Sequence, residues 1–460
     1  MLLSWSSRGA ALFCERKRAM KINRRDFLRS AAGASGALLL GRAAWPALHA
    51  FGVPRDVTLP PPSRSGIEHI VVVMMENRSF DHLLGWLPNA HGKQEGLTYV
   101  DAAGFAHQTH PLAPDYTGCK HPDPDHSYDG GRVQYNDGRM DGFLRSGSND
   151  DYAIGYYVEA DLPFSSALAR NYTTLEHYFC SILGPTFPNR IFLHAAQTDR
   201  LGNTAQLAKV PTIWDRLAAK KVSARYYFSN VPFLGLWGTK YLPISRDYSA
   251  FLLDASLGQL PAVSFIDPRF TVFDDGTGND DHPHADVRAG DAFLAETFHA
   301  VATSPVWPST VFIVTFDEWG GFFDHIAPPR AAAANAVDPD IVDGKTLLGF
   351  RVPVIVASPF SRGDAPNPRV NSLVFDHTSI LKLIEWRWKL APLTPRDASD
   401  DIQNLAYALQ FDQPNAEILD LPQPLPPEPQ PCPNIAFATD SDWWNLIKAG
   451  MLRGWPVAIP

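Results

Sequence analysis

Five short, continuous apolar runs constrain the fold of this 460-residue chain more than any other feature. Long stretches separate them, and they lie at Ile67–Met75, Ala224–Phe228, Ala262–Ile266, Val311–Phe316 and Val352–Ala357. Continuous apolar runs are typical of strands that are covered on both faces, whereas half-exposed strands alternate. Between them lie the helical patterns of Thr212–Lys221, Ala289–Ser304 and Thr378–Leu390. The alternation predicts an α/β sandwich with a mainly parallel central sheet and helices on both faces.

The first 50 residues have the features of an export signal. Arg24-Arg25 precedes a mild apolar stretch at Ala31–Leu40, and small residues follow at Ala47–Ala50. This order resembles a twin-arginine signal peptide, and the apolar stretch is too short to span a membrane. The alternative is a surface helix with a chance arginine pair. We predict a signal peptide at 1–50 with translation starting at Met20, export by the twin-arginine translocation machinery, and a periplasmic or secreted location.

Proline-rich segments enclose the main body of the chain. Residues 51–66 read as an extended linker, and Leu421–Pro433 read as a second one. The second linker leads to a short helical pattern with three tryptophans, within 421–460. This end either docks onto the body or inserts at a membrane interface, and docking is commoner in soluble chains. The body between the linkers, 67–420, is long enough for one large domain or two smaller ones.

The charge balance restricts the partners. Residues 1–50 hold nine of the 40 basic and two of the 49 acidic side chains, which leaves 31 basic against 47 acidic ones and a formal charge of −16. Such a surface repels nucleic acids and disfavours anionic lipid. A zwitterionic or small phosphorylated substrate remains compatible, because a bound metal ion can reverse the local field. Peripheral contact with a membrane therefore stays open.

Cysteine usage gives little structural constraint. Cys14 lies in the predicted signal, and Cys119, Cys180 and Cys432 remain. An odd number of cysteines is not a disulfide framework, although one bridge is compatible with it, and there is no CxxC pair typical of zinc or redox sites. The fold is not expected to depend on such a bridge.

Oxygen-bearing side chains follow two of the predicted strands. Glu76 and Asn77 come directly after the first run, and Asp317 and Glu318 directly after the fourth. If these strands are parallel neighbours, the four side chains meet at the carboxyl edge of the sheet and repel one another unless a cation lies between them. Oxygen ligands favour Ca²⁺, Mg²⁺ or Mn²⁺ over Zn²⁺. Taken singly, each motif also fits a helix cap or a strand-ending turn.

A nucleophile and several histidines complete the candidate set. Thr186 follows the chain break Gly184-Pro185, where a helix N-terminus would stabilise an anion beside its hydroxyl, although Thr186 could equally cap the turn. Histidines in polar, Asp-rich loops are candidates for proton donors and phosphate contacts, although a single histidine is more often structural. They are His126, His282, His284 and His377.

The motifs together resemble a known family. They are "IEHIVVVMMENRSFDHLLGWLP", "GPTFPNR", "DDHPH", "TFDEWGGFFDHIAPP", "GFRVPVIVASPFSRG" and "FDHTSILKLIEWR". In this order they resemble the bacterial phosphoesterase family, which contains non-zinc phospholipases C and metal-dependent acid phosphatases on an alkaline-phosphatase-like core. The resemblance implies that 67–420 form a phosphoesterase catalytic domain with that sandwich.

The resemblance also implies roles for individual residues. One divalent metal ion would be held by Glu76, Asn77, Asp317, Glu318 and Thr186. Thr186 would also be the nucleophile, and His126 and His282 would flank the phosphoryl group. His325 and His377 recur in the motifs without an implied role, and His284 is an additional candidate at a position where the family often has proline.

The implied activity is metal-dependent hydrolysis of a phosphate ester. Cleavage of a phospholipid headgroup through a phospho-threonine intermediate is the leading expectation, and an acid phosphatase acting on soluble monoesters is the alternative. A non-catalytic secreted binding protein on the same fold is a remote alternative, because every matched ligand position keeps a workable side chain. A serine hydrolase is disfavoured because the chain has no Gly-x-Ser-x-Gly elbow.

Overall fold

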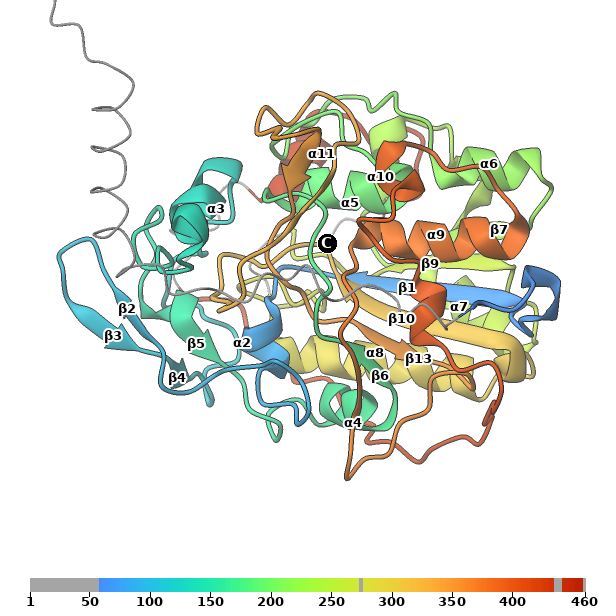
Figure 1. Cartoon of the computed structure of the whole chain (residues 1–460), viewed down its shortest axis with the longest axis horizontal. Helices are drawn as coiled ribbons and strands as arrows, with labels where there is room; N and C mark the ends of the chain where they lie inside the picture. Colours follow the sequence, from blue (N-terminus) through green and yellow to red (C-terminus); the bar gives the residue numbers. More distant parts are fainter. Residues whose placement is uncertain (1–57, 273–275, 434–440, 458–460) are drawn as a thin grey trace, which may run out of the picture. The chain divides into compact units, whose positions relative to one another are not determined.

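An eight-stranded sheet forms the centre of the chain (Figure 1). The computed structural model describes residues 58–272, 276–433 and 441–457, so the predicted signal peptide and residues 51–57 of the first predicted linker lie outside the described residues. The strands of the sheet, in spatial order, are β14 (Arg369–Asn371), β6 (Thr173–Leu175), β13 (Ile355–Ala357), β10 (Thr310–Phe316), β1 (His69–Met75), β9 (Val263–Asp267), β7 (Ala224–Phe228) and β8 (Ser245–Asp247).

The sheet is mainly parallel, as the sequence predicts. β1 pairs in parallel with both β10 and β9, and β7 pairs in parallel with β9 and β8. β13 is antiparallel to both of its neighbours, β10 and β6, and β14 runs parallel to β6. Seven strands therefore share one direction, and the predicted strand at Val352–Ala357 is the one that opposes them.

All five predicted strands are present, with ends that shift by up to three residues. Their apolar side chains are buried because helices cover the sheet, and every residue of β10 is buried. Three further strands, β6, β8 and β14, escaped sequence reasoning. Each has only three residues, and the hydrogen bonds to a neighbouring strand define it more than its own composition does.

Helices lie on both sides of the sheet. Figure 1 shows α5, α6 and α9 on one side and α4 and α8 on the other. The helices are α2 (Phe80–Leu84), α3 (Tyr128–Tyr135), α4 (Pro163–Asn171), α5 (Thr186–Ala195), α6 (Ile213–Ala219), α7 (Tyr248–Ser256), α8 (Val287–Ala302), α9 (His377–Trp388), α10 (Pro395–Ala398) and α11 (Asp442–Lys448). The predicted α/β sandwich is confirmed. Within the described residues, no helix is both long and apolar enough to cross a membrane.

Six short strands form three small ladders outside the main sheet. They are β2 (Thr98–Val100) with β3 (Ala106–Gln108), β4 (His110–Pro111) with β5 (Gly155–Tyr156), and β11 (Arg330–Ala332) with β12 (Lys345–Leu347). The segment 107–148 holds β4, part of β3 and α3. The segment between β4 and α3 carries His126.

A disulfide joins two distant parts of the described chain. Cys119 and Cys432 are bonded across 313 residues of sequence, whereas Cys180 is a free, buried cysteine. The bond ties the loop before α3 to the proline-rich segment that precedes α11. The tryptophan-rich end docks onto the body, which was the commoner of the two alternatives, and its Trp443, Leu446 and Trp455 side chains are buried there.

Candidate active site

The carboxyl ends of β1 and β10 bring the four predicted oxygen ligands together. Met75 lies opposite Phe316 in the parallel ladder, so Glu76 and Asp317 are the next residues of paired strands. The backbone N–H of Asp317 donates to the carbonyl of Met75 (3.2 Å). The Oδ1 atom of Asp317 accepts the N–H groups of Asn77 (3.1 Å) and Glu318 (2.8 Å). The side chains of Glu76, Asn77, Asp317 and Glu318 are fully buried at this edge.

A tight turn after β10 makes this approach sterically feasible. Asn77 has a left-handed backbone (φ 55°), and Gly320 in the opposing turn has φ 63°. A Cβ atom on Gly320 would lie 2.2 Å from the carbonyl oxygen of Asn77. Only glycine therefore fits there, and the DEWGG motif serves to pack one ligand segment against the other.

Arg190 of α5 is an internal cation that sequence reasoning missed. Its Nε atom lies 3.2 Å from Glu76 Oε1 and 2.9 Å from Asp317 Oδ2, and its Nη1 atom lies 3.1 Å from Asp267 Oδ1. The carboxylates raise the pKa of this buried guanidinium above its ordinary value. Arg190 therefore offsets part of the repulsion that the clustered acids create. The motif GPTFPNR ends with this arginine, but nothing in the motif indicates which residues Arg190 contacts.

Buried carboxyl and amide oxygens without a hydrogen bond remain after Arg190 is counted. Burial raises the pKa of Glu76 well above its usual range and that of Glu318 to about 8. Asn77 Oδ1, Glu76 Oε1 and Glu318 Oε1 are buried and accept no hydrogen bond from the described residues. Glu76 Oε1 faces Arg190 Nε (3.2 Å) and Glu318 Oε1 faces His126 Nε2 (3.8 Å) as ion pairs. Buried acceptors are normally hydrogen-bonded as well, so these oxygens indicate a further partner. The donor set fits one divalent cation of the kind that prefers oxygen.

Thr186 is the first residue of α5 and is not its cap. The N-cap is Pro185, and no side-chain capping bond is formed there, so the alternative reading of Thr186 as a capping residue is wrong. Thr186 is buried (2% exposed). It lies four residues before Arg190, and residues at this spacing share one face of a helix. Thr186 and Arg190, which contacts Glu76 and Asp317, therefore lie on the same side of α5.

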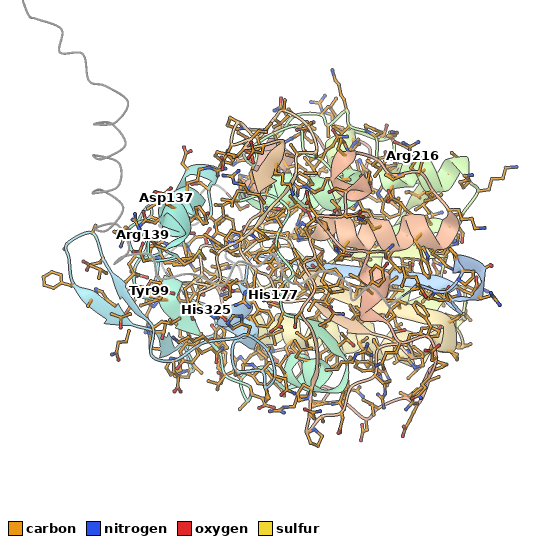
Figure 2. All side chains as sticks on the ribbon, viewed as in Figure 1. Tyr99, Asp137, Arg139, His177, Arg216 and His325 are labelled. Atoms are coloured by element: carbon orange, nitrogen blue, oxygen red, sulfur yellow. A yellow bond between two sulfur atoms is a disulfide. The ribbon has the colours of Figure 1, made fainter. Side chains whose placement is uncertain are left out.

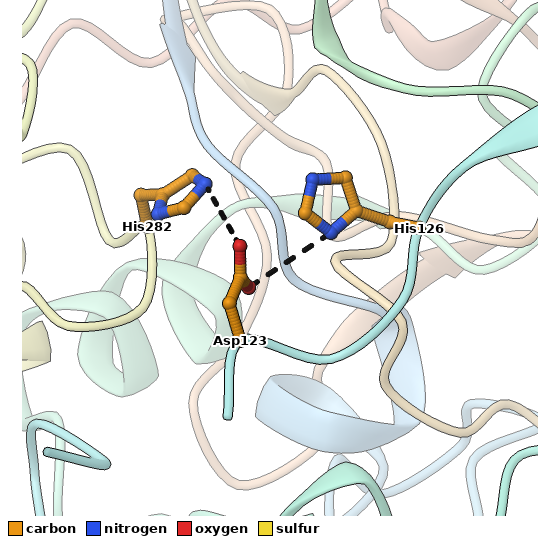
Figure 3. Close-up of side chains that lie close together, drawn as sticks. All are labelled: Asp123, His126 and His282. Atoms are coloured by element: carbon orange, nitrogen blue, oxygen red, sulfur yellow. Dashed lines mark ion pairs between the residues drawn. The ribbon is translucent and has the colours of Figure 1, made fainter. Parts of the chain in front are cut away.

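His126 and His282 lie on either side of Asp123 (Figure 3). Asp123 is 3.9 Å from Nδ1 of His126 and 3.8 Å from Nε2 of His282. The three side chains offer ligand atoms that all lie within 4.8 Å of one another. Asp123 was not singled out from the sequence, because the loop PDPDH contains two aspartates and nothing local separates their roles.

His126 also connects this cluster to the strand ends. Its Nε2 atom is 3.8 Å from Glu318 Oε1, and its Nδ1–H donates to the carbonyl of Pro124 (2.7 Å). Burial opposes a charge on His126, but Glu318 and Asp123 outweigh it and raise the pKa of His126 to about 10. An imidazolium at this point can both contact a phosphoryl oxygen and donate a proton.

A cleft of about 690 Å³ gives access to this region. It is lined by residues 123–129, by Pro185 before the predicted nucleophile, by 201–203, and by Asp442 of α11. A small phosphate ester can therefore reach His126 and the start of α5 from the same side.

Two of the remaining predicted histidines lie apart from this cluster. The Nε2 atom of His284 hydrogen-bonds the carbonyl of His121 (3.0 Å). His377 is fully buried at the start of α9, and its Nε2–H donates to the carbonyl of Phe316 (3.0 Å). His377 therefore holds the last residue of β10, directly before Asp317, and has no direct place in the chemistry.

His325 belongs to a second ionic cluster beside α2 (Figure 2). Its Nδ1 atom lies 2.5 Å from Asp81, and Arg351 bridges Asp81 (3.0 Å) and Asp324 (3.0 Å). Burial raises the pKa of Asp324 to about 6, whereas Arg351 and His325 overcome burial and hold the pKa of Asp81 below its usual range. These acids already have a fixed cation between them, so we interpret the cluster as structural.

Replacing Arg351 by methionine is expected to destabilise the protein by about 3–5 kcal/mol, because Asp81 and Asp324 would stay buried without their shared cation. Urea unfolding followed by circular dichroism measures this change. Arg288→Met is the control, since Arg288 pairs with Asp286 near the surface and should cost no more than about 1 kcal/mol. Equal effects of the two substitutions would contradict the structural role.

The chain is similar to known proteins in sequence and in fold. The family model described as "Phosphoesterase family" matches residues 67–391. "Non-specific phospholipase C6" of Arabidopsis thaliana is 31% identical over 73% of this chain and 71% of its own length. "Phospholipase C A" of Mycobacterium tuberculosis is 30% identical over 91% of this chain and 92% of its own length. Among solved structures, a protein in the alkaline phosphatase superfamily from Vibrio parahaemolyticus aligns with 82% of this chain and 79% of its own at 11% identity and a TM-score of 0.35.

The matched range begins just before β1 and ends after α9, so it contains both pairs of candidate ligands, Thr186 and the two histidines beside Asp123. On this match, the chain belongs to the phosphoesterase family and is a hydrolase that acts on phosphoric ester bonds.

Proposed function

We propose that this chain is an exported, metal-dependent phosphoesterase that cleaves the headgroup of a phospholipid in the manner of a phospholipase C. One observation carries the proposal: Glu76 and Asp317 follow paired strands, and both contact Arg190, which shares a helix face with Thr186. The relatives named phospholipase C support a phospholipid as substrate. The acidic net charge favours a neutral or zwitterionic lipid over an anionic one.

The proposed reaction has two steps. Thr186 gives its hydroxyl proton to water in the cleft, its Oγ1 attacks phosphorus, the bond from phosphorus to the leaving oxygen breaks, and a phospho-threonine that still carries the headgroup forms. His126 or His282 gives a proton to the leaving alcohol. Water then attacks phosphorus and gives a proton to the histidine, the bond from phosphorus to Thr186 Oγ1 breaks, the headgroup phosphate leaves, and Oγ1 takes a proton from water to restore the hydroxyl. In both steps Arg190 holds the carboxyl groups of Glu76 and Asp317 in place. The N–H groups at the start of α5 orient the nucleophile.

The proposed cation would be held by Glu76, Asn77, Asp317, Glu318 and Thr186. When bound, it would lower the pKa of the Thr186 hydroxyl and offset the negative charge of the phosphoryl oxygens. Glu318 also faces His126, so the same carboxylate would connect the ligand set to the proton donor.

A substrate panel tests the proposal. Purified protein without residues 1–50 is assayed on phosphatidylcholine, sphingomyelin and p-nitrophenyl phosphate, with and without chelator. We expect hydrolysis of a phospholipid that chelator abolishes and that an added divalent ion restores. Hydrolysis of p-nitrophenyl phosphate alone would point to an acid phosphatase, and full activity in chelator would contradict the metal.

Export is a separate prediction. Replacing Arg24-Arg25 by Lys-Lys should retain the folded, unprocessed protein in the cytoplasm, because the twin-arginine route requires the arginine pair. Cell fractionation with immunoblotting measures this, and a version that starts at Met20 should be exported normally. Normal export of the Lys-Lys protein would point to the general secretory route.

A further inference from the structure

Helix α11 contacts the candidate metal ligands from the far end of the sequence. It begins at Asp442, well beyond the family match that ends at residue 391. Trp443 is buried (2% exposed), and its indole N–H donates to Glu76 Oε2 (3.2 Å). Glu76 Oε1 accepts no hydrogen bond from the described residues. The indole therefore occupies one carboxylate oxygen of Glu76, and the other, Oε1, faces Arg190 Nε at 3.2 Å.

Aromatic packing fixes the direction of this indole. The ring of Trp443 stacks on Phe270 with centroids 3.7 Å apart and planes 17° apart. The ring of Phe187 lies 5.5 Å away on another side. The guanidinium of Arg190 lies over the same Phe270 ring, at 4.7 Å. A ring held in this way has little rotational freedom, so its N–H points steadily at Glu76.

The preceding residue of α11 reaches the nucleophile turn. Asp442 accepts a hydrogen bond from the side-chain amide of Asn203. The Oδ1 atom of the same Asn203 accepts the backbone N–H of Phe187 (2.7 Å), the residue after Thr186. Asp442 also lines the cleft that contains His126. Two consecutive residues of α11 thus connect to the ligand Glu76 and to the backbone that carries Thr186.

Two further bonds fasten α11 at this place. Ser441 caps the helix, accepting the N–H of Trp444 (3.1 Å), and its hydroxyl donates to the carbonyl of Val272 (2.7 Å), two residues after the stacked Phe270. The Cys119–Cys432 disulfide ties the segment before α11 to the loop that carries Asp123 and His126. The start of α11 is therefore bonded to the segment that carries Phe270, and the chain before α11 is bonded to the loop that carries His126.

We propose that α11 completes the catalytic site: Trp443 is a positioning residue that orients Glu76 for cation binding, and Asp442 positions the Thr186 turn through Asn203. The inference rests on the proposed function of the Glu76 and Asp317 site. Side chains that orient metal ligands usually contribute about 10–100-fold to metal affinity. Helix α11 lies outside residues 67–391, which the family model matches, and would still contribute to a site whose ligands lie within them.

The test compares two tryptophans from the same end of the chain. Trp443→Phe keeps the stacked ring and removes the N–H. Trp455→Phe removes a comparable indole bond, to the carbonyl of Gly238 (3.0 Å), away from the ligands. Each full-length mature protein is stripped of metal, titrated with Mn²⁺ in a calorimeter and melted. We expect Trp443→Phe to weaken Mn²⁺ binding about 10–100-fold, with a melting temperature close to that of Trp455→Phe, which should bind Mn²⁺ like the wild type.

Asp442→Ala tests the second contact. We expect its kcat to fall about 10–100-fold, since small misplacements of reacting groups have effects of this size, while its Mn²⁺ affinity stays unchanged. Wild-type Mn²⁺ affinity in Trp443→Phe, or equal weakening in both tryptophan variants, would overturn the role of Trp443. An unchanged kcat in Asp442→Ala would overturn that of Asp442. A wild-type protein that binds no divalent cation would contradict the proposed function itself.

Discussion

Thr186→Val is expected to abolish phosphoester hydrolysis and to leave the fold intact. Valine replaces the hydroxyl by a methyl group of similar size, so the packing at the buried start of α5 is kept. Because Thr186 forms no capping bond through its side chain, α5 loses no cap. The loss of a covalent nucleophile normally costs several orders of magnitude in rate, so a fall of at least about 10³-fold is expected.

The kinetic measurement is kcat on the best substrate of the panel, with circular dichroism and melting temperature as checks of folding. Thr186→Ser is the matched control, because it keeps a hydroxyl at the same place and should retain measurable turnover. Mass spectrometry after acid quenching should find the phosphorylated headgroup (or phosphate, with a monoester substrate) on residue 186 of the wild type and none on the valine variant. A valine variant that keeps more than about a tenth of the activity would rule out Thr186 as the nucleophile.

Asp317→Asn is expected to lower bound metal and activity together. The change removes one negative charge from the ligand set and keeps an oxygen to accept the N–H groups of Asn77 and Glu318. A direct ligand should matter at least as much as the side chains that orient ligands, so we expect a loss of Mn²⁺ affinity of more than about 100-fold. Glu76→Gln should act in the same direction, for the same reason.

Asp324→Asn is the matched control for this prediction. Asp324 is an equally buried acid, but it belongs to the Arg351 cluster, so its variant should lose stability and keep the metal. Elemental analysis and calorimetry with Mn²⁺ separate the two effects. Metal loss on changing Asp324 and not Asp317 would move the site to the Asp81 cluster, and a fully active wild type without metal would remove the assignment.

The order of strands and helices was readable because burial on both faces leaves a local signature. β1, β7, β9 and β10 are mainly apolar runs, and their ends in the structure differ from the predicted ends by no more than two residues. The acids after β1 and β10 were predictable for a related reason, since parallel strands end at one edge of the sheet. The reversed direction of β13 was not readable, because an apolar run has the same composition in either direction.

The partners of the site residues depended on contacts between distant segments. Arg190 bonds to Asp317 across 127 residues, and Trp443 bonds to Glu76 across 367. Asp123 stands beside an equally suitable Asp125, and only the folded loop determines which of them lies between the two histidines.

The sequence by itself determined the fold class and the family, and it predicted the candidate site residues, because periodicity and short motifs carry this information. Only the tertiary structure showed that Arg190 lies between Glu76 and Asp317, that Cys119 pairs with Cys432, and that α11 contacts Glu76. The physical reason is that tertiary packing determines which residues contact a buried charge or an aromatic ring. These contacts join residues that lie hundreds of positions apart, so no local sequence pattern predicts them.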